Sequence, residues 1–525
     1  AAGLDRMRWS HGAPPWLAPL LLLASSRAHY AGARSVHDHE EPVILISMDG
    51  FKADYFDMYA PPTLQRLAAH GVRSELKPAF TTKTFPNHWT LVTGVFEETH
   101  GIIANAMYDP DLNSTFSMAT TDPRWWNRAE PVWVTAEKVG VRTGTYFWPG
   151  SEVKLEGVRP SRWMHFDSSV PFEERVSTVL EWLSAKDAPR LVTLYFEEPD
   201  SAGHRYGPES EEVREAVLKV DAAIGMLIEG LEKRRTLDQT NLVITADHGM
   251  TALSPERVIR LYECAPNNAS HPYVLTADTP TVNLWPRRAE DTEPLLAKLK
   301  ACHPNLTAWS KEEVPERFHF RRSNRVPPIV ALADEGWTVC SSAERCSGCC
   351  GNHGFDNELH SMHPIFVAHG PAFRRGFDFP VFSNVHVQAL LCRLLGIIPQ
   401  KPANGTVVAV APMLVEFDTE GAGLGGGNED GGDTGPIGLV IAVFVSLGLV
   451  AVGLTLAFMI KRSMDKRREY ERYAEADRFS MEMTYNLNPS ASPIQPTQSA
   501  ETLKETSATA PTESDRTGLL SYGAL

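Results

Sequence analysis

Short apolar runs recur along the middle of the chain, and each of them ends at a polar or glycine-containing segment. Their length and β-branched content are typical of strands that are buried on both faces. Stretches with a helical period of apolar residues separate these runs. The predicted strands are Val43 to Ser47, Gly144 to Phe147, Leu191 to Phe196, Leu242 to Thr245 and Ile365 to Ala368, and the predicted helices are 63–70, 172–185, 210–233 and 384–395. This alternation predicts an α/β fold with a largely parallel sheet and helices on both faces.

Two further apolar segments lie outside the alternating region. Arg6 and Arg8 precede an apolar run from residue 16 to 24, which predicts a secretory signal peptide over residues 1–28, with a buried first helix as the alternative. Residues 437–460 contain no charge and are long enough to cross about 30 Å of hydrocarbon, which predicts a transmembrane helix. Acidic residues precede this segment and basic residues follow it. The positive-inside rule therefore predicts a single-pass type I protein with a cytosolic C-terminus.

This topology divides the rest of the chain. Residues 29–417 are predicted to form one globular ectodomain on the extracellular or luminal side, at the plasma membrane or in the secretory pathway. Residues 418–436 are Gly-rich and acidic, which favours a flexible stalk, and residues 461–525 contain too few apolar residues for a core, which favours a disordered tail. The N-x-S/T acceptors all precede the predicted membrane span; they are Asn113, Asn268, Asn305 and Asn404.

The cysteines also precede the predicted span, where disulfides can persist. They are Cys264, Cys302, Cys340, Cys346, Cys349, Cys350 and Cys392. We expect a local bridge between Cys264 and Cys302. The run from 346 to 350 is consistent with disulfides, which the compartment favours, or with a metal clip. Because the number is odd, one thiol is left over or pairs with another chain.

Acidic and histidine side chains follow the predicted strands or lie in glycine-rich turns. The i and i+4 spacing of Asp200 and His204 lets both reach a single ion if the segment is helical. Each such residue alone is common at a surface or in a core, but three carboxylates and three imidazoles together nearly neutralise two Zn²⁺ ions. The predicted ligands are Asp49, Asp200, His204, Asp247, His248 and His353.

Thr84 is a candidate nucleophile near this set. Pro86 is placed like the first residue of a helix and Thr84 like its cap, so a capping role without chemistry is one interpretation. A hydroxyl at a helix N-terminus also lies in positive potential beside amide donors that suit phosphate. If zinc coordinates this hydroxyl, it can ionise near neutral pH and attack phosphorus.

Taken together, the motifs closely resemble the ectonucleotide pyrophosphatase/phosphodiesterase family of the alkaline phosphatase superfamily. The resemblance covers residues 43 to 416 in order, and it is closest to the short, single-pass membrane-anchored members. The motifs are Asp49-Gly50, Thr84-Phe85-Pro86-Asn87-His88, His100-Gly101-Ile102-Ile103-x-Asn105, Phe147-Trp148-Pro149-Gly150, Glu198-Pro199-Asp200-x-x-x-His204-x-Tyr206-Gly207-Pro208, Asp247-His248-Gly249-Met250 and His353-Gly354-x-Asp356-Asn357.

The resemblance implies an alkaline-phosphatase-like fold and a phosphodiesterase ectodomain with two Zn²⁺ ions. It implies that one ion is held by Asp49, Thr84, Asp247 and His248, and the other by Asp200, His204 and His353. It also implies that Thr84 forms a phospho-threonine intermediate. Asn105 and the amide of Phe85 are expected to hold a non-bridging phosphate oxygen.

The expected substrate is an extracellular nucleotide or dinucleotide that is cleaved to a nucleoside 5′-monophosphate. Phe85 and Phe166 resemble the aromatic pair that stacks on the base in nucleotide-cleaving relatives, where position 166 is often Tyr. The alternative is that both rings are core residues. A choline-phosphate lipid phosphodiesterase and a catalytically silent adhesion or receptor protein are the competing functions. No binding to duplex nucleic acid is expected, and the sequence predicts no oligomeric state.

Overall fold

The structure is a computed structural model, and it describes residues 41–415 apart from 271, 277–278, 344–345 and 347. The predicted signal peptide (1–28), stalk (418–436), transmembrane helix (437–460) and tail (461–525) lie outside the described residues, so their boundaries stay predictions. Within residues 41–415, no described helix is both long enough and apolar enough to cross a bilayer.

A nine-stranded sheet forms the centre of the described region. Its strands are β1 (Val43–Met48), β2 (Val72–Lys77), β5 (Thr143–Tyr146), β6 (Arg162–Met164), β7 (Leu191–Phe196), β8 (Asn241–Thr245), β17 (Ile365–His369), β18 (Phe377–Asp378) and β19 (Phe382–Ser383). Their order is β18-β2-β17-β8-β1-β7-β5-β6, and β19 also pairs with β2. β17 is antiparallel to both neighbours, whereas the other pairs in this sheet are parallel. The prediction of a mostly parallel sheet is therefore confirmed.

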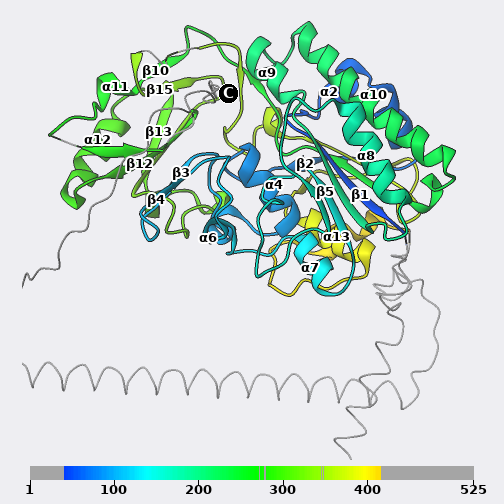
Figure 1. Cartoon of the computed structure of the whole chain (residues 1–525). Coiled ribbons are helices and arrows are strands. Elements are labelled where there is room, and N and C mark those ends of the chain that lie inside the picture. Colours follow the sequence, from blue (N-terminus) through cyan, green and yellow to red (C-terminus); the bar gives the residue numbers. More distant parts are fainter. Residues whose placement is uncertain (1–40, 271, 277–278, 344–345, 347, 416–525) are drawn as a thin grey trace, which may run out of the picture. The chain divides into compact units, whose positions relative to one another are not determined.

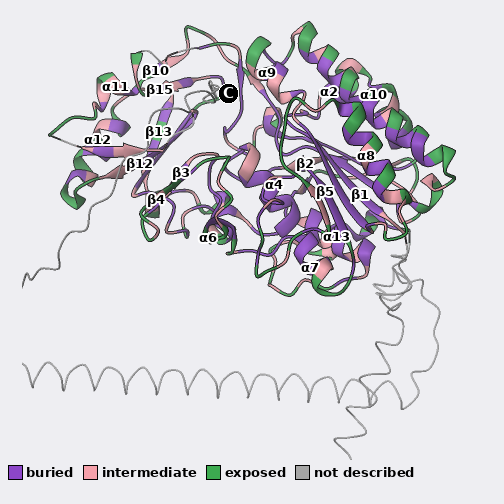
Figure 2. Ribbon diagram, in the orientation of Figure 1, coloured by how far each residue is buried: buried purple, intermediate pink, exposed green. Residues whose placement is uncertain are grey.

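Helices cover both faces of this sheet, as predicted (Figure 1). One layer contains α2 (Tyr55–Tyr59), α3 (Pro62–Ala69), α8 (Phe172–Ser184) and α10 (Glu211–Lys233), and the other contains α4 (Thr84–Thr93), α7 (Val132–Lys138) and α13 (His386–Leu395). Strand β1 shows why two layers are needed, because Val43 and Leu45 belong to one apolar core and Ile44 and Ile46 to the other. Figure 2 shows the central strands buried along their length. Successive side chains of a strand point to opposite faces, so an uninterrupted apolar run requires cover on both.

Several short elements join this framework. They are α5 (Glu97–His100), α6 (Pro123–Trp126) and α9 (Asp200–Tyr206), the strand pairs β3 (Met107–Asp109) with β4 (Ser114–Phe116) and β9 (Thr251–Ala252) with β16 (Gly351–Asn352), and the 3₁₀ turns η2 (Leu237–Gln239), η3 (Ala289–Asp291), η4 (Lys311–Glu313), η5 (Glu316–Phe318), η7 (His360–Met362), η8 (Val407–Ala409) and η9 (Ala411–Met413).

A second, antiparallel sheet lies between β8 and β17 along the chain, and the sequence analysis did not predict it. It has the order β11-β12-β14-β13, and a separate parallel pair joins β10 and β15. The elements are β10 (Val258–Arg260), α11 (Leu261–Cys264), β11 (Tyr273–Leu275), β12 (Thr281–Pro286), α12 (Thr292–Lys300), β13 (Leu306–Ser310), β14 (Ile329–Ala333) and β15 (Thr338–Cys340). This part has its own apolar core, which includes Val282, Leu295 and Leu299.

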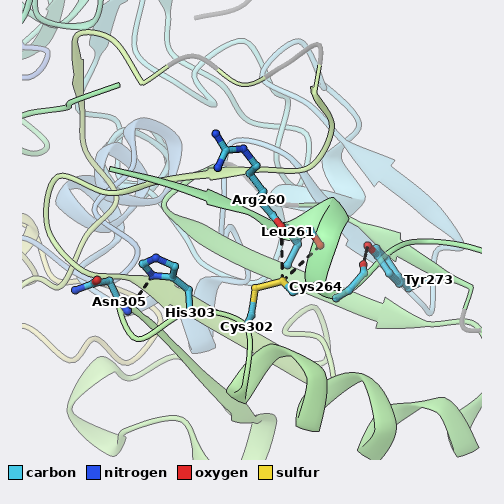
Figure 3. The surroundings of a disulfide bond; sticks show 8 residues. Arg260, Leu261, Cys264, Tyr273, Cys302, His303 and Asn305 are labelled. Carbon is cyan, nitrogen blue, oxygen red and sulfur yellow. Dashed lines mark hydrogen bonds between the residues drawn. A yellow bond between two sulfur atoms is a disulfide. The ribbon is translucent and has the colours of Figure 1, made fainter. Parts of the chain in front are cut away.

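The disulfides agree with the expected compartment. Cys264 and Cys302 are bridged, as predicted, and the bond fastens α11 to the end of α12 (Figure 3). The other bridges join Cys340 with Cys346 and Cys349 with Cys350, so this cysteine run forms disulfides instead of a metal clip. The remaining thiol, Cys392, is buried, and burial raises its pKa to about 12. It is therefore not placed to pair with another chain.

Candidate active site

The predicted ligands meet at one edge of the central sheet, because three neighbouring parallel strands end there. Asp49 follows β1, and Asp247 and His248 follow β8. Asp200 begins α9 four residues after β7, and its amide donates to the carbonyl of Asp49 over 3.0 Å. Carboxyl ends of parallel strands lie on the same side of a sheet, which is where ligands bind in open α/β folds.

The first group of ligand atoms surrounds the Nε2 atom of His248. This atom lies 2.9 Å from Asp247 Oδ2 and 3.5 Å from Asp49 Oδ1. The Oγ1 atom of Thr84 lies 3.4 Å from the same nitrogen. The three ionisable residues are buried and offer atoms within 4.8 Å of one another, which is close enough to hold one metal ion.

The second group contains Asp200, His204 and His353. The Oδ1 atom of Asp200 lies 3.4 Å from Nε2 of His204 and 3.6 Å from Nε2 of His353, and the two imidazole nitrogens are 3.1 Å apart. His248 connects the two groups, because its ring stacks on His353 with 3.5 Å between centroids and it also lies within ligand distance of Asp200. The structure therefore brings all seven predicted residues, Thr84 included, into one cluster.

The histidine tautomers fit metal binding. Each of the three rings has its Nδ1 atom beside a backbone carbonyl: His204 at 3.0 Å from Gly351, His248 at 2.9 Å from Gly249 and His353 at 2.7 Å from Thr82. A carbonyl oxygen only accepts hydrogen bonds, so Nδ1 carries the proton and Nε2 of the neutral ring has a free lone pair. Two such lone pairs 3.1 Å apart cannot bond to each other, but a cation between them satisfies both.

The carboxylates fit as well. Asp49 Oδ1, Asp200 Oδ1 and Asp247 Oδ2 are buried and have no hydrogen-bond partner. Buried polar atoms are rarely left without a partner, and these three face the imidazole lone pairs. The donor set is mixed nitrogen and oxygen, which suits zinc better than magnesium or calcium.

The electrostatics of the protein groups show the same shortage of positive charge. Burial, and then the Asp247 and Asp200 carboxylates, raise the pKa of Asp49 well above its usual value. Burial disfavours charge on Asp247 and His248, but their mutual attraction outweighs it, lowering the pKa of Asp247 and raising that of His248. Burial, with the nearby imidazoles and Lys83, lowers the pKa of His353, so its ring is neutral and able to bind a metal.

Thr84 is not a helix cap, contrary to one interpretation of the sequence. The N-cap of α4 is Lys83, Thr84 is the first helical residue, and Pro86 is the third. The hydroxyl is directed at His248 and makes no capping bond, because the helix begins at Thr84, two residues earlier than the proline pattern predicted. Thr84 thus lies at a helix N-terminus and also beside the proposed ligand atoms.

Asn105 is held next to Thr84. Its Oδ1 accepts the backbone amide of Phe85 over 2.9 Å. This bond occupies the Phe85 amide that was expected to bind phosphate oxygen, and it leaves the two N–H donors of the Asn105 side chain for another acceptor.

The two predicted base-stacking rings differ in exposure. Phe166 is 44% exposed and touches Phe147 and Tyr195 edge-on, so it is not a core residue. Its amide donates to Glu152. Phe85 is partly buried against the apolar core. Phe166 therefore presents a ring to solvent, and Phe85 presents only part of one.

The sequence analysis assigned no supporting role to two residues, Tyr195 and His88. Tyr195 donates its hydroxyl to Asp49 Oδ2 over 2.6 Å, and His88 binds the carbonyl of Thr84 through Nδ1 at 2.9 Å and the hydroxyl of Ser47 through Nε2 at 2.8 Å. Tyr195 lies beside Ser47 in the pairing of β7 with β1. For Tyr195, the available signal in the sequence was a polar group near the end of a predicted apolar strand.

Glycines allow the close packing around these ligands. Gly50 has φ +67°, and a Cβ there would lie 2.8 Å from the Cβ of Asp200. At Gly249 a Cβ would lie 2.0 Å from the carbonyl oxygen of Ser361. Any side chain at either position would displace a segment that carries a ligand.

Comparisons with known proteins agree with this geometry. The family described as type I phosphodiesterase/nucleotide pyrophosphatase matches residues 43–356. The chain is 42% identical to the bis(5′-adenosyl)-triphosphatase of Xenopus laevis over 70% of this chain and 80% of that protein. It is 40% identical to ectonucleotide pyrophosphatase/phosphodiesterase family member 5 of Homo sapiens over 72% of this chain and 79% of that protein.

Solved structures are similar too. The murine ectonucleotide pyrophosphatase/phosphodiesterase 5 superposes with a TM-score of 0.69 at 40% identity, covering 71% of this chain and all of that one. A second murine structure has the same TM-score and identity and is of an inactive variant, in which a threonine is replaced by alanine, in complex with AMP.

Proposed function

This chain belongs to the type I phosphodiesterase/nucleotide pyrophosphatase family and is an enzyme of that kind, and we propose that it cleaves nucleotides with two Zn²⁺ ions and Thr84 as the nucleophile. The observation that carries the proposal is the buried cluster of partnerless carboxylate oxygens and imidazole lone pairs with the Thr84 hydroxyl at its edge. We assign Asp49, Thr84, Asp247 and His248 to one ion, and Asp200, His204 and His353 to the other.

Zinc supplies Lewis acidity and lowers the pKa of a coordinated hydroxyl. Thr84 is placed at the N-terminus of α4, where the helix dipole favours an anionic phosphate. Its Oγ attacks phosphorus, the bond to the leaving group breaks, and phospho-threonine forms. Water then hydrolyses this ester, releasing a nucleoside 5′-monophosphate and restoring the Thr84 hydroxyl.

Asn105 stabilises the charge that develops on the phosphate. Because its Oδ1 is fixed by the Phe85 amide, its side-chain N–H groups are oriented before substrate binds. Donors that are preorganised in this way contribute most where charge builds up in the transition state.

The proposed substrate is a nucleotide or dinucleotide. The exposed Phe166 ring and the accessible part of Phe85 suit stacking on a base, which is worth about 1–3 kcal/mol in single-strand binders and tolerates any base. The AMP complex of the murine relative and the name of the Xenopus laevis relative support this substrate class. Phenylalanine at 166 offers the base no hydroxyl contact.

We also propose that the enzyme is a single-pass type I membrane protein with its catalytic domain outside the cell or in the secretory lumen. The three disulfides and the four N-x-S/T acceptors support an oxidising compartment. The anchor is the apolar segment 437–460, which lies outside the described residues.

The test compares two chromogenic esters, the p-nitrophenyl ester of a nucleoside 5′-monophosphate and p-nitrophenyl phosphorylcholine, on purified zinc-loaded protein. We expect the nucleotide ester to be preferred. We expect Thr84→Ala to lower kcat by about a thousandfold or more because the nucleophile is removed, while the six remaining proposed ligands keep zinc bound. Thr84→Ser should keep measurable turnover.

Preference for the choline ester would assign the enzyme to lipid substrates. A fully zinc-loaded wild-type protein without turnover would support the adhesion or receptor alternative. Near wild-type activity in Thr84→Ala would show that another group attacks phosphorus.

A further inference from the structure

The residue before the proposed nucleophile is a lysine in a position that local rules disfavour. Lys83 is the N-cap of α4, and its side chain makes no capping hydrogen bond. N-caps are usually Ser, Thr, Asp or Asn, and the positive end of the helix dipole disfavours a cation. The residue is also only 6% exposed, which is rare for lysine. A residue that breaks these rules beside Thr84 indicates a role outside the helix.

The Lys83 ammonium group joins two segments that are distant in sequence. Its Nζ atom donates to the backbone carbonyl of Thr279 over 3.0 Å and to Oδ1 of Asn352 over 3.3 Å. Nδ2 of Asn352 donates to the same carbonyl over 3.0 Å, so the three groups form a closed triangle. Thr279 lies two residues before β12 of the antiparallel sheet, and Asn352 ends β16. Lys83 therefore ties the antiparallel sheet and β16 to the start of α4.

Asn352 passes this constraint to the next residue, the proposed ligand His353. The Oδ1 atom that accepts Lys83 also accepts the backbone amide of His353 over 2.8 Å. Thr82 holds the same turn from another direction. Its carbonyl lies 2.7 Å from Nδ1 of His353, and its hydroxyl accepts the amide of Gly354 over 2.8 Å. Three consecutive residues therefore hold His353 and supply the proposed nucleophile.

The lysine stem packs directly against this turn. Gly354 has φ +105°, and a Cβ there would lie 2.5 Å from Cε of Lys83. The stem thus lies against the residue after His353, while the ammonium group fastens the residue before it. Removing the ammonium group should free the turn at Asn352, whereas the hydrogen bonds to Thr82 remain.

We propose that Lys83 is a positioning residue that fixes His353 relative to Thr84, acting through Asn352 and the Thr279 carbonyl. The inference rests on the proposed function, since it takes His353 as a zinc ligand and Thr84 as the nucleophile. Partners that orient metal ligands change metal affinity or activity by about 10- to 100-fold. Lys83 therefore matters for the zinc ion that we assign to His353 and for the rate of attack, and little for substrate affinity.

The test uses Lys83→Met, which keeps an unbranched stem but has no donor. Equilibrium dialysis with elemental analysis measures zinc binding, and a nucleotide ester assay gives kcat and KM. We expect one of two zinc equivalents to bind about 10- to 100-fold more weakly than in wild type. At saturating zinc we expect kcat to fall about tenfold or more, because the ligand and the nucleophile are no longer held in register, while KM stays close to that of wild type.

Lys311→Met is the matched control. Lys311 is also partly buried and also donates to a distant backbone carbonyl, that of Ser323, over 2.7 Å. It lies on η4, a segment without proposed ligands. Both variants lose a lysine hydrogen bond to the backbone and should melt below wild type, but only Lys83→Met should lose zinc affinity and kcat.

A double-mutant cycle with Asn352→Ala separates positioning from a general loss of stability. Because Lys83 and Asn352 act on His353 through one contact, the double variant should lose less zinc affinity than the product of the two single losses. Lys311→Met and Asn352→Ala should combine independently. Asn352→Ala alone should show the same loss of zinc affinity and kcat, which keeps the test open if Lys83→Met does not fold.

Wild-type zinc affinity and kcat in Lys83→Met would overturn the proposal. An equal loss in Lys311→Met would do the same, and so would independent effects of the Lys83 and Asn352 variants. Failure of the proposed function is a separate outcome, because wild type itself would then bind no zinc or show no turnover.

Discussion

Two buried aspartates in this molecule, Asp109 and Asp49, differ in the partners that surround their carboxylates. Asp109, at the end of β3, is 1% exposed, and it accepts Nε of Arg325 at 2.7 Å and the amides of Asp111 and Leu112. Asp49, at the end of β1, is 2% exposed, and it has Tyr195 on one oxygen and no partner on the other. The negative charge of Asp109 is therefore compensated by groups of the chain, whereas that of Asp49 is not.

The pKa directions follow from this difference. Burial works against ionisation of both groups. At Asp109 the bonds from Arg325 and the amides outweigh burial and lower the pKa, whereas at Asp49 the neighbouring carboxylates add to burial and raise it. The chain itself supplies the positive charge and hydrogen bonds that Asp109 needs, but Asp49 requires a cation from solution. This contrast separates the structural ion pair from the proposed metal site.

Removing metal tests the contrast most strongly. Treatment with a chelator should abolish hydrolysis and lower the free energy of unfolding, by about 4 kcal/mol if free zinc had been about a thousand times Kd, because zinc binds the folded chain. Calorimetry and a nucleotide ester assay measure both effects. Restored zinc should restore both, and unchanged activity after complete metal removal would contradict the metal site.

Arg325→Met should destabilise the protein by about 3 kcal/mol, the lower end of the cost of breaking a buried ion pair, since it leaves the buried Asp109 carboxylate with only Arg128, whose Nη2 atom lies 3.3 Å away. Denaturant unfolding with zinc present measures this loss. Arg214→Met, which breaks the exposed pair with Glu211, is the control and should leave stability within error. Equal stability of both variants would show that the Asp109 pair is not needed.

Tyr195→Phe should weaken zinc binding or lower activity by about 10- to 100-fold, because it removes the hydrogen bond that orients Asp49. Zinc titration and kcat/KM give the readouts. Folding should be retained, since the ring and its packing remain. A wild-type zinc affinity together with wild-type kcat/KM would mean that Asp49 is oriented by other contacts.

The smallest effect concerns pH. The pKa of Asp109 is lower in the folded protein than its unfolded value of about 3.9. Its ionised form therefore contributes stability that is fully present above this value and is lost as pH falls through the folded pKa. The difference in unfolding free energy between wild type and Asp109→Asn should be constant near neutral pH and shrink in acid. A difference that grows in acid would contradict the assignment.

Five strands of the central sheet, β1, β5, β7, β8 and β17, were predictable because they are runs that are buried on both faces, as at Leu191–Phe196. The antiparallel sheet was not predicted, because its strands include short ones such as Tyr273–Leu275 and because β12 is placed by pairing with the distant β14, as at Thr281 with Leu332. Strand β2, with the sequence VRSELK, was also missed, since its alternating pattern is weakly apolar. Pairing with β17 places it in the sheet.

The proposed site was predictable in composition but not in geometry. Aspartates that follow apolar strands were found because parallel strands bring their ends together. The stacking of His248 on His353, with 3.5 Å between ring centroids, joins loops that are far apart in sequence, so no local pattern indicated it. The start of α4 at Thr84 was misplaced by two residues because Pro86 was taken as the first residue of the helix.

The position of the antiparallel sheet in the chain has a consequence for how the protein is made. The sheet separates His248 from His353, which lie 105 positions apart (353 − 248). Asp49, Asp247 and His248 have therefore all left the ribosome well before His353 is synthesised. On the ligand assignment proposed above, the nascent chain completes one ligand group first, so one ion could bind and begin to organise the sheet before the His353 ligand of the other ion is translated.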